Sequence, residues 1–225
     1  FWAFNGNVIS VVQQLYEKFY KEPKYQDLWF YWDGKPLLLY NAEPELDANG
    51  GWHEYKDGKA DYSDEVKQFF TLRNMWWGYY EWNGKRFIGT EDNWSFGYSM
   101  ADSAILAMSP DELVSKHNGR LEEAAVTPAQ HPVTMTKVPM GVGKSWSREF
   151  GEPKLNEYDM PDSAYVPWLG KTVADPTGYG IYFQERWDDA LKSDPEFIYL
   201  NDWNEWTAGK YNGEVGWLGR QNPFM

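Results

Sequence analysis

The chain has no cysteine, only three histidines and few basic side chains for its size. Without cysteine it has no disulfide framework and no thiolate chemistry, although this does not identify a compartment. Its 225 residues include 34 acids and 21 bases, giving a formal net charge of -13. Nucleic acids and anionic membranes need a basic protein face, so we expect neither as a partner. No apolar run approaches the roughly 20 residues that cross a bilayer, so we expect no membrane span.

The chain begins at Phe1, without an initiator Met, and it shows no recognisable signal peptide. The start of the protein can therefore be missing, and the absence of a signal says little about location. The composition is 42% hydrophobic, enough for a sizeable core. No internal repeat or linker divides the chain, so residues 1–225 are expected to form one domain, truncated at its N-terminus.

Aromatic residues are unusually abundant: 14 Trp, 16 Tyr and 12 Phe make up 19% of the chain. Most of them should fill the core. Several Trp, however, stand beside polar residues, as in "WFYWDGK", "YYEWNGK", "EDNWSFGY" and "NDWNEW". An indole can stack on the apolar C–H face of a sugar while carboxylates and amides bind its hydroxyl rim. The composition therefore favours carbohydrate as the ligand class.

Hydrophobic periodicity predicts an alternation of helices and strands. Expected helices cover residues 8–20, 25–29, a short segment from Ser63, 110–118 and 182–193; expected strands cover 37–40, 69–77, 121–126 and 196–202, with a hairpin or insert over 83–98. Residues 43–64 and 127–170 read as long loops. Such alternation is typical of parallel βαβ units and of a (β/α)8 TIM-type barrel, whose site lies after the carboxyl ends of the strands. Only about four strands are visible, so we expect part of that barrel.

Helix 182–193 is the clearest of the predicted helices. Its apolar residues Phe183, Trp187, Ala190 and Leu191 recur at helical spacing and are expected to form its buried face. Asp194 and Pro195 are expected to stop it.

Several short motifs predict no site. "MGVGKSW" at 140–146 lacks a phosphate loop's first glycine, because position 138 is Val. The three histidines are scattered and have no zinc spacing. The Asp-rich stretch 46–61 fails the EF-hand pattern. We therefore expect no cofactor, although a loose structural calcium site in this stretch stays open. "NWS" at 93–95 fits a glycosylation acceptor, a weak signal.

The stretch "NDWNEW", residues 201–206, ends the last apolar strand and is the strongest candidate site. One or two of its residues could simply cap a turn, but six are harder to explain that way. Glycoside hydrolysis needs paired carboxyl groups, and a nearby Trp can raise the pKa of one of them. We take Glu205 and Asp202 as candidate catalytic residues. Candidate substrate-binding residues are Asn201, Trp203, Asn204, Trp206, Trp94, Glu91, Asp92 and Glu81.

"FIYLNDWNEWTAGKY", with "GYGIYFQERWDDALKSDPEF" before it, resembles the last helix and strand of barrel proteins related to glycoside hydrolase families 99 and 71. "WFYWDGKPLLLY" and "FFTLRNMW" resemble earlier parts of such proteins. The resemblance implies a (β/α)8 barrel, glycan substrates and a secreted, periplasmic or cell-surface location. In family 99 the motif reads N-E-W-x-E-G, and both Glu are catalytic. Glu205 matches the first, but the second falls on Ala208, so the family's mechanism does not carry over whole.

Three functions remain open from the sequence. The first is a glycoside hydrolase, in which Glu205 acts as a base or electrostatic stabiliser. The acid would then be Asp202, with Glu81, Glu91 and Asp92 as alternatives. The second is a non-catalytic glycan-binding protein on the same barrel scaffold, which the loss of an acid at Ala208 favours. The third is a domain associated with glycosyltransferases.

Overall fold

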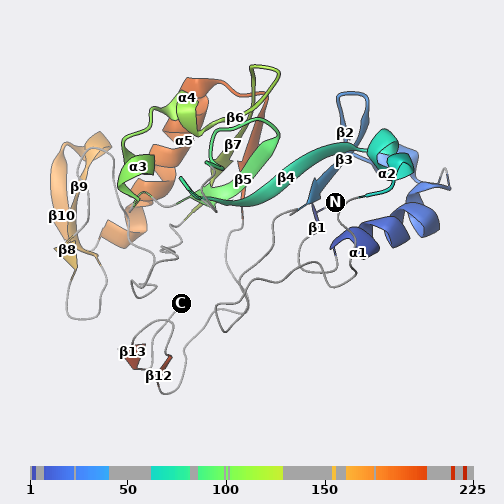
Figure 1. The fold of residues 1–225 in the computed structure, drawn as a ribbon. Coiled ribbons are helices and arrows are strands. Elements are labelled where there is room, and N and C mark those ends of the chain that lie inside the picture. Colours follow the sequence, from blue (N-terminus) through green and yellow to red (C-terminus); the bar gives the residue numbers. More distant parts are fainter. Residues whose placement is uncertain are drawn as a thin grey trace. The chain divides into compact units, whose positions relative to one another are not determined.

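The computed structural model describes two compact units, residues 1–76 and 77–225 (Figure 1). The described residues are 2–3, 8–22, 24–40, 62–81, 86–98, 100, 102–128, 154–155, 161–174, 176–201, 214–215 and 220–221.

The first unit is built on short parallel strands linked by helices. Its elements are β1 (Trp2–Ala3), α1 (Val8–Leu15), the π-helical turn η1 (Tyr16–Tyr20), η2 (Gln26–Leu28), β2 (Tyr31–Trp32), β3 (Lys35–Tyr40), α2 (Asp64–Phe69) and β4 (Thr71–Gly78), whose last two residues belong to the second unit. β3 pairs in parallel with β1 and with β4, while β2 forms an antiparallel hairpin with β3. The Ser63 side chain accepts a hydrogen bond from the Val66 amide and so caps α2, the short helix expected from Ser63. The core of this unit contains Ile9, Val12, Leu38, Tyr62, Val66 and Phe70.

The second unit contains more elements and more antiparallel pairing. They are β5 (Asn93–Tyr98), α3 (Ser103–Leu106), α4 (Pro110–Leu113), β6 (Ser115–His117), β7 (Arg120–Val126), β8 (Lys154–Leu155), β9 (Pro161–Val166), η3 (Pro167–Leu169), β10 (Lys171–Ala174), η4 (Pro176–Tyr179), α5 (Ile181–Ser193), β11 (Phe197–Leu200), β12 (Glu214–Val215) and β13 (Arg220–Gln221). One sheet has the order β11-β7-β6, a second β10-β9-β8, and β12 pairs with β13.

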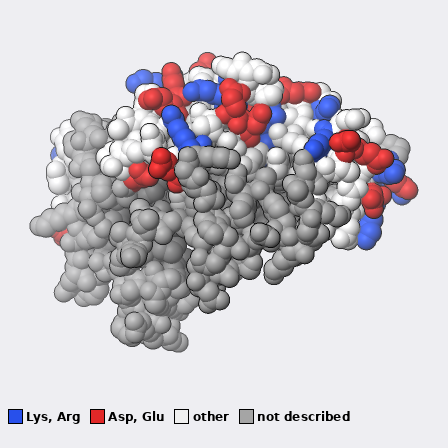
Figure 2. All heavy atoms as spheres, in the orientation of Figure 1, with Lys and Arg blue, Asp and Glu red and all other residues white. Residues whose placement is uncertain are grey.

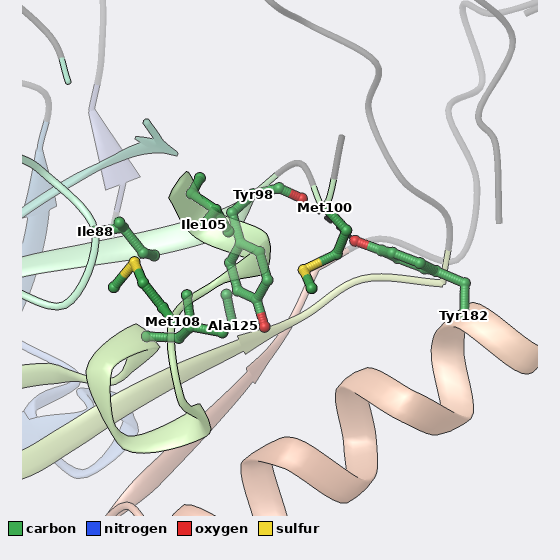
Figure 3. Close-up of a cluster of buried hydrophobic side chains, with 8 residues drawn as sticks. Ile88, Tyr98, Met100, Ile105, Met108, Ala125 and Tyr182 are labelled. Carbon is green, nitrogen blue, oxygen red and sulfur yellow. Dashed lines mark hydrogen bonds between the residues drawn. The ribbon is translucent and has the colours of Figure 1, made fainter. Parts of the chain in front are cut away.

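The second unit has two groups of buried apolar side chains. One group joins α3, α4 and β5 to α5 and contains Ile88, Tyr98, Met100, Ile105, Met108, Leu113, Ala125 and Tyr182 (Figure 3). The other packs α5 on β7 and β11 through Val114, Ala124, Val126 and Ala190. Together they hold α5 against the parallel pair of β7 and β11, so the position of that pair is fixed by the core.

The expected (β/α)8 barrel is wrong. The described residues form small sheets of mixed direction with five α-helices, and none of these sheets closes into a barrel. The predicted parallel pairs do occur, β3 with β4 and β7 with β11. Hairpins interrupt them, however: β6 pairs antiparallel with β7, and β9, which lies inside the expected loop 127–170, pairs antiparallel with β10 directly after it. Alternation of helices and strands predicts parallel neighbours but does not require that they continue around a barrel.

Two further predictions need correction. The expected helix 110–118 ends at Leu113, because residues 115–117 pair with β7 as β6. The predicted buried face of α5 is right in three of its four residues. Ala190 is buried, and half-buried Phe183 and Trp187 pack against the same core, whereas Leu191 is exposed. The buried face also extends over Tyr182 and Arg186, and a pattern of apolar residues does not include the arginine.

Candidate functional site

The parallel strands β7 and β11 end side by side. Leu200 is in register with Val126, and the Asn201 amide donates a hydrogen bond to the Val126 carbonyl at 2.9 Å. Thr127 and half-buried Asn201 therefore leave the sheet at the same end. We call this end the carboxyl edge. Ligands of sheets with parallel strands characteristically bind outside the carboxyl ends of their strands.

β5 approaches the same edge in the same direction. Its early residue Trp94 contacts Glu122 of β7, and its later residue Gly97 lies against Thr127. A Cβ added to Gly97 would come within 2.8 Å of Thr127 Cγ2 and 2.7 Å of a ring carbon of Trp77. Only glycine allows this close approach.

The Thr127 side chain is also fixed from α5. It hydrogen-bonds the phenol of Tyr182, which in turn donates to the Tyr98 carbonyl at 3.3 Å. Burial raises the pKa of Tyr182, so its phenol stays protonated and keeps its donor. The carboxyl edge is thus held by a helix, a tight glycine contact and a buried hydrogen bond, which is the kind of support that a preorganised site needs.

Most of the candidate site in "NDWNEW" lies outside the described residues. Asn201 is described, and its backbone bond to β7 places the start of the motif at the carboxyl edge. Asp202, Trp203, Asn204, Glu205 and Trp206 are not described, nor is the stretch 46–61 for which calcium was considered.

Trp94 is a core residue of β5 with no exposed surface. Its indole N–H donates to Glu122 Oε2 at 2.8 Å, and its ring stacks on Phe197 with centroids 5.3 Å apart. Phe197 begins β11, so Trp94 lies toward the amino end of that strand. A sugar could stack on Trp94 only after the indole was uncovered.

Glu91 and Asp92 are exposed and fasten the turn between β6 and β7. The Glu91 carboxylate accepts hydrogen bonds from the amides of Asn118 and Gly119, and Asp92 Oδ1 lies 2.7 Å from His117 Nδ1. This turn is at the start of β7, about 20 Å from the carboxyl edge at the rise of a strand. Glu81, the third acid among the candidate substrate-binding residues outside "NDWNEW", is also exposed and follows β4. The structure therefore does not bring Glu91, Asp92 and Trp94 together with Asn201.

Two buried acids in β7 were missed from the sequence. Glu122 Oε1 forms an ion pair with Arg120 at 2.9 Å in addition to the Trp94 bond. Glu123 Oε2 accepts from the Ser95 amide at 3.1 Å and from Ser115 Oγ at 3.4 Å. Within the described part of the chain, Glu123 Oε1 has no hydrogen-bond partner. The signal was present in "LEEAAV", since adjacent residues of a strand face opposite sides and both faces here are apolar.

Burial raises the pKa of Glu123 to about 8, with the Ser95 and Ser115 bonds acting in the opposite direction. The carboxyl group is therefore mostly protonated at neutral pH. Glu122 and Glu123 point to opposite faces of β7, and they lie about 13 Å or more before the carboxyl edge. Such a pair cannot flank one glycosidic bond, so we assign both a structural role.

No group of three potential metal ligands occurs among the described residues. Nor does any helix in the described ranges have the length and apolar character to cross a membrane. Comparison with protein-family models, with curated proteins and with solved structures found no match to this chain. The resemblance to glycoside hydrolase families 99 and 71 rests on the quoted motifs alone.

Proposed function

We propose that the chain is a carbohydrate-active protein that binds a glycan at the carboxyl edge and hydrolyses a glycosidic bond there. The observation that carries this proposal is the parallel pairing of β7 and β11. Because of it, Asn201, the first residue of "NDWNEW", leaves the sheet beside Thr127. The next five residues in the chain combine two carboxyl groups, two indoles and an amide. Indoles can cover a sugar face, and the polar groups can bind its hydroxyls.

The roles within the motif follow from the chemistry of glycoside hydrolysis. One carboxyl group protonates the leaving oxygen, and the other acts as base, nucleophile or stabiliser. Glu205, the residue that matches the family 99 motif, is assigned to the second role. Asp202 becomes the preferred acid, because Glu91 and Asp92 fasten a turn at the other end of β7.

The charge of the protein favours neutral or basic glycans. Figure 2 shows acidic and basic side chains of the described residues interspersed on the face in view, without a large basic patch. With a net charge of -13, polyanionic chains such as uronate polymers should be repelled.

A second candidate is glycan binding without hydrolysis. Ala208 occupies the position of the second catalytic Glu in the family 99 motif. If Asp202 does not supply the missing acid, the remaining indoles, amides and Glu205 still suit a binding protein.

The test combines binding and hydrolysis on one panel of neutral, basic and acidic polysaccharides. Binding is measured by calorimetry and hydrolysis by released reducing ends, for the unchanged chain, Glu205→Gln and the exposed control Glu65→Gln. For an enzyme we expect Glu205→Gln to lower the rate on the order of 10²-fold or more while binding persists. Binding with no hydrolysis by any variant would favour the second candidate, and no binding to any glycan would refute both.

A further inference from the structure

Arg186 is a charged side chain buried inside the second unit. It lies on α5 with 1% of its surface exposed, between the rings of Tyr98 and Tyr182, whose centroids are 5.8 Å and 5.4 Å from its guanidinium carbon. Its Nη2 atom pairs with Glu185 and, at 3.0 Å, with Asp189 Oδ2. These contacts explain how the positive charge is tolerated.

The other nitrogens of this guanidinium are not satisfied by the protein. Nε and Nη1 have no hydrogen-bond partner within the described residues. Together these two atoms carry three N–H donors. Buried donors without a partner are costly and rare, and such groups are commonly satisfied by ordered water.

A small cavity adjoins Arg186. Its volume is about 10 Å³, and it is lined by residues of α4, α5, β5 and β7, among them Ala124, Asp189, Ala190 and Ser193. On this measure a single water needs about 10–15 Å³, so the cavity has room for about one water. The lining also offers acceptors. The Ser193 hydroxyl, which donates to the Asp189 carbonyl, still has lone pairs, and the Asp189 carboxylate has acceptor sites beyond its bond to Arg186.

We propose that this cavity is a binding site for one internal water molecule, which accepts a hydrogen bond from Arg186 Nε or Nη1. The water donates its protons to acceptors in the lining, Ser193 Oγ or the Asp189 carboxylate. An anion is not the occupant, because Glu185 and Asp189 already face the guanidinium with two negative charges. The site is independent of the proposed function, although Arg186 packs on Tyr182, which fixes Thr127 at the carboxyl edge.

The direct test is a crystal structure of the chain at a resolution that resolves ordered water, with one crystal grown in bromide. We expect a density peak within hydrogen-bonding distance of Nε or Nη1 and no anomalous signal at that position. An anomalous peak there would identify an anion and overturn the proposal. So would an empty cavity with both nitrogens bonded directly to protein groups.

A second test fills the cavity. Ala190→Val and Ala124→Val add methyl groups to its lining, and we expect each to remove the peak and lower the midpoint temperature by about 2–4 °C or more. Ala174→Val, at an exposed position of β10, is the control and should leave both unchanged. Because added methyl groups can also strain a core, the change at Ala190 is repeated with Arg186→Met, which has no donors to solvate. If Ala190→Val lowers the midpoint temperature less in the Arg186→Met protein than in the unchanged chain, the proposal is supported. An equal drop in both proteins would mean that the effect is strain and would contradict the proposal. Should Arg186→Met fail to fold, the crystal structure of the unchanged chain decides.

Discussion

Replacing Glu123 with Gln should change how the stability of the second unit depends on pH. The folded protein holds the pKa of this carboxyl at about 8, whereas its ordinary value is 4.5. Between these two pH values the folded chain keeps a proton that the unfolded chain releases. Stability from this group is therefore fully present below pH 4.5 and is lost as the pH rises toward 8.

The size of the effect follows from the shift. Each pH unit in this window costs about 1.4 kcal/mol, so Glu123 should lower the free energy of unfolding by about 3 kcal/mol between pH 4.5 and pH 7. Gln has the same shape and does not titrate. Its carbonyl can accept the bonds from Ser95 and Ser115, while its amide takes the place of the oxygen that has no partner. That buried amide costs about 1–3 kcal/mol, but the cost does not change with pH.

The assay is denaturant unfolding at a series of pH values from 5 to 8.5, followed by tryptophan fluorescence. All other titrating groups occur in both proteins, so the difference between Glu123→Gln and the unchanged chain isolates position 123. We expect the variant to gain stability relative to the unchanged chain by about 2.5 kcal/mol between pH 5 and pH 7. Glu65→Gln, on the exposed side of α2, should keep the original pH dependence. Parallel curves for Glu123→Gln and the unchanged chain would show that Glu123 is not a buried proton acceptor.

Three further substitutions test individual contacts by denaturant unfolding. Trp94→Phe keeps an aromatic ring but removes the bond to Glu122, and it should cost about 1–3 kcal/mol; an unchanged midpoint would contradict the buried bond. Gly97→Ala should cost about 1–3 kcal/mol, because the added methyl would lie 2.7 Å from Trp77; a neutral result would mean that β5 is farther from the carboxyl edge. Asp92→Asn should change the free energy of unfolding by less than about 1 kcal/mol and should leave any glycan hydrolysis unaffected. Loss of hydrolysis would show that Asp92 does belong to the functional site.

Local structure could be predicted well wherever short-range physics decides it. The apolar spacing of residues 8–20 predicts α1 and η1, and the hydroxyl of Ser63 predicts the start of α2. The apolar strands around Leu38 and Ile198 are also found. The run in β3 is buried on both faces, as a continuous apolar run predicts, whereas the residues of β11 are half-buried.

Pairing between distant segments could not be predicted in the same way. Residues 161–174 have few apolar clusters, yet they pair as β9 and β10 through backbone groups that every sequence carries. Residues 115–117 follow a capped helix, yet pairing with β7 makes them a strand. Tertiary context overrides local preference in both segments, which is also why the barrel expectation failed.

The candidate site residues differ in whether they precede or follow a strand in the sequence. Glu91 and Asp92 precede β5 and therefore lie at the amino end of a strand, where they bind backbone amides and His117. Asn201 follows β11 and lies at the carboxyl end. Proximity to Trp in the sequence does not distinguish these two situations, because indoles occur at both ends of strands. Of the acids proposed outside "NDWNEW", only Glu81 follows a strand, three residues after Gly78, which lies against Gly97 of β5. If Asp202 does not supply the acid, strand order therefore selects Glu81, and not Glu91 or Asp92, as the next residue to replace.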